Sequence, residues 1–116
     1  MLDILVQIGA GLLGAAIGGA AGYFIGKALS NYFDKAKTWF DQAWHSIQRI
    51  TLAVGILVRR GNRLFKQFVV KTFGGEIESY EDSTDEGVEI EWDALTDEAK
   101  KALMEDEYLP VQRYEL

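Results

Sequence analysis

The chain has 116 residues, no cysteine and one histidine, which excludes disulfides, thiolate zinc sites and thiol catalysis. Its net charge of −6 hides an uneven layout: residues 1–26 carry only Asp3, residues 27–73 carry nine Lys/Arg and two Asp, and residues 74–116 carry fifteen acidic and three basic residues. We therefore expect a non-enzymatic protein without a cofactor, divided into regions 1–28, 29–73 and 74–116.

The first region is expected to be a membrane helix. Residues 4–26, which we call the glycine segment, are twenty-three residues without a charge, and this length is enough to cross a bilayer. A cleaved secretory signal is the alternative, but the acidic start Met-Leu-Asp and the long apolar stretch favour a retained helix. The excess of Lys/Arg beyond it predicts a single-pass protein with its N-terminus outside and its C-terminus in the cytoplasm.

Small residues in the glycine segment recur at a spacing of four. On a helix such a row forms a groove with almost no side chains, which allows a second helix to approach closely. The row from Ala10 to Gly26 resembles the glycine-zipper segments of membrane channels and rotor rings, and this resemblance implies close-packed homo-oligomers. The predicted helix-packing interface contains both small-residue rows: Ala10, Gly11, Gly14, Ala15, Gly18, Gly19, Gly22 and Gly26.

The second region is expected to continue as a long amphipathic helix. Apolar or small residues recur at steps of three and four from Leu5 to Phe68, and no proline interrupts them. A strand is the alternative for residues 51–72, because Thr51 to Val58 is rich in β-branched residues and Gly61-Asn62 could form a tight turn. The spacing of apolar residues after Asn62 favours the helix.

Aromatic rings and lysines concentrate directly after the glycine segment. Such residues are typical of the bilayer interface, and the lysines would contact an anionic leaflet. The alternative is that the rings form a core between neighbouring subunits and the charges form a solvated face. The predicted membrane-interface set is Lys27, Tyr32, Phe33, Lys35, Lys37, Trp39, Phe40 and Trp44.

A basic cluster consists of Arg59, Arg60, Arg63 and Lys66. Nucleic-acid phosphates are one partner for such a cluster, but no base-reading motif accompanies it. The acidic third region of the same or a neighbouring subunit is the favoured partner, and nucleic acid is not expected.

The third region is expected to form a small hairpin and a helix. Residues 76–80 and 88–92 alternate apolar and acidic side chains, as hairpin strands do. Thr96 is a suitable N-cap for a helix to about Glu107, and the chain beyond Pro110 should be extended. The loop from Asp82 has some calcium-loop offsets but lacks the final glutamate, so no metal is expected. One face of this helix contains Trp92, Leu95, Ala99 and Leu103. It is a candidate docking surface for an unknown protein, and the alternative is that it packs on the hairpin.

Together these patterns predict a mainly α fold: an N-terminal glycine-zipper transmembrane helix that continues into a long amphipathic helix, followed by a small acidic C-terminal β-hairpin plus helix. The predicted function is to anchor, scaffold or permeabilise a membrane as a homo-oligomer formed through the glycine-zipper helix. One alternative is a structural subunit of a virion, secretion apparatus or filament, in which the glycine helix packs against protein. A second is a pore-forming toxin or effector.

Overall fold

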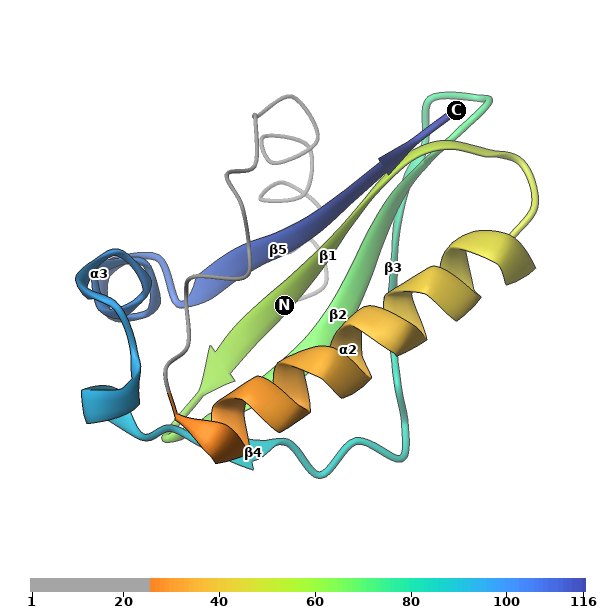
Figure 1. Cartoon of the computed structure of the whole chain (residues 1–116). Coiled ribbons are helices and arrows are strands. Elements are labelled where there is room, and N and C mark those ends of the chain that lie inside the picture. Colours follow the sequence, from red (N-terminus) through yellow and green to blue (C-terminus); the bar gives the residue numbers. More distant parts are fainter. Residues whose placement is uncertain (1–25) are drawn as a thin grey trace.

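A twenty-residue helix, α2 (Lys27–Ser46), precedes an antiparallel sheet in this computed structural model, which describes residues 26–116. Figure 1 shows α2 lying along one face of the sheet and the short helix α3 beside β5. The remaining elements follow in chain order: β1 (Ile50–Arg60), β2 (Arg63–Thr72), β3 (Ile77–Glu81), β4 (Val88–Glu89), a 3-10 turn (Trp92–Ala94), α3 (Asp97–Glu105) and β5 (Tyr108–Glu115).

The sheet is built around the hairpin of β1 and β2. Its strand order is β3-β2-β1-β5, with β4 also paired to β2, and every pair is antiparallel. The hairpin ends on the two-residue turn Gly61-Asn62, and the positive φ of Gly61 (63°) matches a type II′ turn, which takes glycine at its first central position. The acidic strands β3 and β4 therefore lie on one side of the hairpin and β5 on the other.

The predicted mainly α fold is wrong. The helix ends at Ser46, and residues 50–72 form two strands, so the strand alternative for 51–72 is the correct one. Residues 76–80 and 88–92 do not form a hairpin with each other either, because β3 and β4 both pair with β2. The apolar residues at steps of three and four continued past Ser46 because β1 and β2 carry apolar side chains on both faces. A nearly continuous run of apolar residues fits the spacing of a helix as well as that of a buried strand.

Close packing joins α2 to the sheet. Leu29, Ala36 and Phe40 are buried against the sheet, and the ring of Phe40 stacks on Phe68 with centroids 5.9 Å apart. A Cβ placed on Gly55 would lie 2.4 Å from the Phe40 ring. The glycine in β1 is therefore the gap that admits this ring.

The third region contains two correctly predicted elements. The hydroxyl oxygen of Thr96 accepts a hydrogen bond from the Ala99 N–H at 3.2 Å, which caps α3 as expected. The chain beyond Pro110 is extended, as predicted, and forms most of β5.

Candidate functional site

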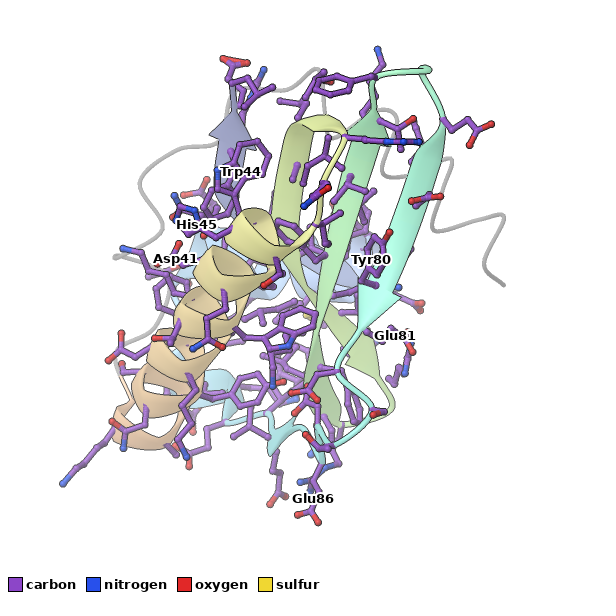
Figure 2. The ribbon with its side chains drawn as sticks, turned by 90° about the vertical axis from the view of Figure 1, so that its right-hand side faces the viewer. Asp41, Trp44, His45, Tyr80, Glu81 and Glu86 are labelled. Atoms are coloured by element: carbon purple, nitrogen blue, oxygen red, sulfur yellow. The ribbon has the colours of Figure 1, made fainter. Side chains whose placement is uncertain are left out.

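The basic cluster lies at the β1–β2 turn, where the acidic region passes around it. Arg60 forms an ion pair with Glu81 of β3. The guanidinium of Arg63 donates to the backbone oxygens of Glu86 and Gly87 at 3.1 and 3.2 Å. In Figure 2 Glu81 lies on β3 and Glu86 on the loop that closes this end of the sheet. These two arginines therefore hold the loop between β3 and β4 against the hairpin.

Arg59 connects the hairpin to the other end of the acidic region. Its Nε donates to the backbone oxygen of Leu103 in α3 at 3.0 Å, and its Nη1 donates to that of Gly61 at 3.1 Å. Its guanidinium also lies 5.8 Å from the ring centre of Trp92. This side chain therefore contacts the turn, the 3-10 turn and α3 at once.

Lys66 is the most enclosed member of the cluster, with only 10% of its side chain exposed. Its ammonium lies 3.1 Å from Asp82 and 3.6 Å from Asp85, and 5.6 and 5.7 Å from the ring centres of Tyr32 and Trp39. The ammonium is therefore enclosed by two carboxylates and two aromatic rings. We call this set of five residues the lysine cluster.

Asp85 is the centre of the hydrogen bonds in the lysine cluster. Its Oδ2 accepts from the Tyr32 hydroxyl at 2.5 Å and from the Lys66 N–H at 3.0 Å, and its Oδ1 accepts from the Gly87 N–H at 2.9 Å. Burial by itself would raise the pKa of this carboxyl, but these hydrogen bonds and the lysine charge outweigh burial and lower the pKa. Burial and the same carboxylate raise the pKa of the Tyr32 hydroxyl far above its usual value.

The acidic side chains of the loop from Asp82 are not arranged as calcium ligands. Asp82 accepts hydrogen bonds from the backbone N–H and hydroxyl of Thr84 and pairs with Lys66, and these interactions lower its pKa. Within residues 26–116 no three His, Cys, Asp or Glu side chains are grouped so as to hold a metal ion. The loop acids instead bind groups of their own chain.

The aromatic members of the predicted membrane-interface set belong to the core of the domain. Phe40 is fully buried, while Tyr32, Phe33, Trp39 and Trp44 are half-buried and pack against the same cluster. The three lysines of the set, Lys27, Lys35 and Lys37, are exposed. The rings thus form a core within one chain, and the lysines lie on the solvent-facing side of α2.

The last turns of α2 are fixed by a contact with β5. Trp44 stacks on Tyr114 with centroids 5.4 Å apart, and the Tyr114 hydroxyl donates to Asp41. Figure 2 shows Asp41, Trp44 and His45 together in these turns. Burial and the Asp41 carboxylate raise the pKa of Tyr114 far above its usual value.

The candidate docking face is part of the same core. Leu95, Ala99 and Leu103 are buried, and Trp92 is half-buried with its Nε1 donating to the Asn62 side chain at 3.1 Å. The face therefore packs within its own domain, although not on the predicted hairpin of residues 76–80 and 88–92, which does not form.

Sequence reasoning missed an apolar surface on the side of the sheet opposite α2. We call it the second face, formed by Val54, Ile56, Val58 and Val69, with Leu52, Ile77 and Tyr108 around them. The signal for it is the unbroken apolar run from Ala53 to Val58, because a strand with one open face alternates apolar and polar residues.

One polar side chain is buried on the second face. Gln67 pairs with Ile56 across the hairpin and is 0% exposed. Its Nε2 donates to the Ser79 hydroxyl at 2.6 Å and to Glu81 at 3.3 Å, whereas its Oε1 has no hydrogen-bond partner among the described residues.

The predicted helix-packing interface, apart from Gly26, lies outside residues 26–116, as does the predicted membrane span. Gly26 itself forms the N-cap of α2 and lies against Ala94. No helix in the described part of the chain is long and apolar enough to cross a membrane. The chain matches no protein-family profile, no curated protein sequence and no solved structure.

Proposed function

We propose that this is a non-enzymatic membrane protein whose glycine segment inserts into a bilayer and self-associates, with the α/β domain held at the cytoplasmic surface. The observation that carries the proposal is the position of Gly26. It is both the last residue of the uncharged stretch and the N-cap of α2, so no linker separates the glycine segment from the domain. Assembly through the segment would therefore set the spacing of the domains as well.

The distribution of charge supports a glycine segment that inserts into the bilayer and a domain that lies at the lipid surface. Arg60 and Lys66 form ion pairs with the acidic region, and Arg59 and Arg63 donate to its backbone oxygens. The basic cluster is thus engaged within the chain. The lysines of α2 are exposed instead, and Lys27 directly follows the glycine segment, where a cation would contact anionic lipid headgroups.

The test is the mass of the detergent-solubilised protein, measured for the wild type beside Gly18→Leu and Gly22→Leu. A leucine in the glycine row would keep neighbouring helices apart, so we expect both variants to form smaller oligomers. Ala20→Leu is the matched control, because residue 20 would lie on the opposite side of the proposed helix from this row. This variant should keep the wild-type mass. Equal masses for all four proteins would show that the glycine row does not mediate assembly.

Membrane insertion is tested separately by flotation with vesicles of phosphatidylcholine and phosphatidylglycerol. The wild-type chain should float with the vesicles and stay with them after a wash at high salt, because insertion is apolar whereas surface attraction is screened. Release of the chain by salt would show that it binds only the membrane surface, through the exposed lysines, and does not insert.

A further inference from the structure

The sheet has two apolar faces, and the described helices pack on only one of them. Residues of α2 and α3 belong to the core cluster that contains Ala53, Leu57 and Phe68. Among residues 26–116, the second face is formed by side chains of β1, β2, β3 and β5 alone. Figure 1 shows α2 on one side of the sheet and α3 beside β5.

Burial nevertheless runs continuously along the two central strands. Six consecutive residues of β1, from Ala53 to Val58, are buried, and so are the four residues of β2 from Gln67 to Val70. Continuous burial of this kind belongs to strands that are covered on both faces, since successive side chains point to opposite sides. The second face therefore needs a cover as apolar as itself.

We propose that residues 4–25 of the same chain dock on the second face when the chain is outside a membrane. This inference rests on the proposed function, because it gives the membrane-inserting segment a second, protein-bound state. The segment has no charge to bury, and its small-residue rows would let it lie close to the sheet. Its apolar side chains would in turn leave water.

The dimensions and the point of attachment agree with this occupant. As a helix, the glycine segment would be about 34 Å long, and the eleven residues of β1 span about 36 Å. Gly26 lies against Ala94, next to Glu91, and Ile90 hydrogen-bonds to the β1–β2 turn. A segment that starts at Gly26 would therefore begin at one end of the sheet and be long enough to reach the other.

Gln67 adds a buried hydrogen-bond acceptor to the second face. Its buried Oε1 has no partner among residues 26–116, and a covering segment that brings a donor would satisfy it. A lipid chain offers no donor.

The absence of cysteine allows a direct test by disulfide cross-linking in the full chain. Val69 lies six residues beyond Arg63 at the turn, a distance of about 20 Å that a helix covers in about thirteen residues. Counting back from Gly26 leads to residue 13. We would therefore combine Val69→Cys with single cysteines at each of positions 11–18, two turns of helix, and oxidise the protein without detergent.

At least one of these pairs should form a disulfide within a monomer. Val70→Cys is the matched control, because Val70 neighbours Val69 but belongs to the face covered by α2, and it should form none. Only intermolecular disulfides would assign the second face to another copy of the chain and overturn the proposal. No disulfide at any of the eight positions would also overturn it.

A labelling experiment tests the exchange between sheet and membrane. In detergent-free solution the thiol of Val69→Cys should react with a maleimide about 100-fold more slowly than that of Thr38→Cys on the exposed side of α2, because a buried thiol reacts only after local opening. Adding phosphatidylcholine–phosphatidylglycerol vesicles should remove this protection as the chain binds them.

The two proposals fail in different ways. If the intramolecular disulfide forms but the chain never binds vesicles, docking stands and the membrane function is wrong. If the chain inserts while the Val69→Cys thiol stays protected, the membrane function stands and residues 4–25 are not the cover of the second face.

Discussion

Asp85 holds together groups from three parts of the chain. Its two carboxylate oxygens accept hydrogen bonds from α2 through Tyr32, from β2 through the Lys66 backbone, and from its own loop through Gly87. Only 6% of its side chain is exposed. A carboxylate that is both buried and fully hydrogen-bonded fixes the position of its neighbours more firmly than a surface ion pair does.

Replacing Asp85 with asparagine should lower the free energy of unfolding by about 2 kcal/mol, since hydrogen bonds to a charged group are lost and an amide N–H₂ opposes other donors. Urea unfolding followed by tryptophan fluorescence measures this change. Glu86→Gln is the matched control, because it removes the same charge from an exposed side chain of the same loop and should stay within about 0.5 kcal/mol of wild type. Equal losses in the two variants would contradict the role given to Asp85.

The lysine cluster shows what sequence spacing cannot predict at the scale of residues. Tyr32 and Asp85 are fifty-three residues apart, and Lys66 and Asp85 are nineteen apart. The local spacing around Asp82 showed only some offsets of a calcium loop and gave no sign of Lys66 or Tyr32 as its neighbours. The opposite charges of the two regions did favour their pairing, which Arg60 with Glu81 and Lys66 with Asp82 bear out. The individual partners depend on the sheet register, which the sequence alone does not reveal.

Of the secondary-structure elements, the β1–β2 hairpin is the one most easily mistaken for a helix in the sequence. Val54, Ile56 and Val69 face one side of the sheet while Ala53, Leu57 and Phe68 face the other, so the strands show no alternation of apolar and polar residues. Without alternation, a strand and a buried helix look alike. The turn residues Gly61-Asn62 were the better signal. The α3 helix was predictable because its signal is local: Thr96 caps a backbone N–H three residues away.

The contact of α2 with β1 depends on the missing side chain of Gly55. Gly55→Ala would place a methyl group 2.4 Å from the Phe40 ring, so we expect a loss of about 1–3 kcal/mol in the free energy of unfolding. Gly74→Ala is the control, since the nearest atom would lie 3.8 Å from its Cβ, and it should be close to neutral. In a double-mutant cycle, Phe40→Leu should reduce the cost of Gly55→Ala. Additive losses would show that the two residues do not interact.

For the whole molecule, the shifted pKa values predict stability that falls at both ends of the pH scale. Asp82 and Asp85 have lowered pKa values, so their contribution is present above the ordinary carboxyl value of 3.8 and is lost as pH falls through the folded-state values. Tyr32 and Tyr114 have raised pKa values, so their contribution is present below 10.0 and is lost as pH rises above it.

Urea unfolding from about pH 2 to about pH 11 measures this profile. Tyr32→Phe should be less stable than wild type at neutral pH, because the hydrogen bond to Asp85 is lost, and its stability should decline less steeply at alkaline pH. An unchanged alkaline slope would mean that Tyr32 titrates at its ordinary pKa in the folded chain.

The order in which the strands are synthesised affects the risk of aggregation during synthesis. β1 obtains one neighbour from β2 within a few residues, but its other edge pairs with β5, and Leu52 and Glu115 are sixty-three positions apart. Until β5 leaves the ribosome, an apolar strand edge is open to other nascent chains, and such edges template aggregation. The open edge of β1 is therefore the part of the growing chain most exposed to pairing with other chains before β5 is made.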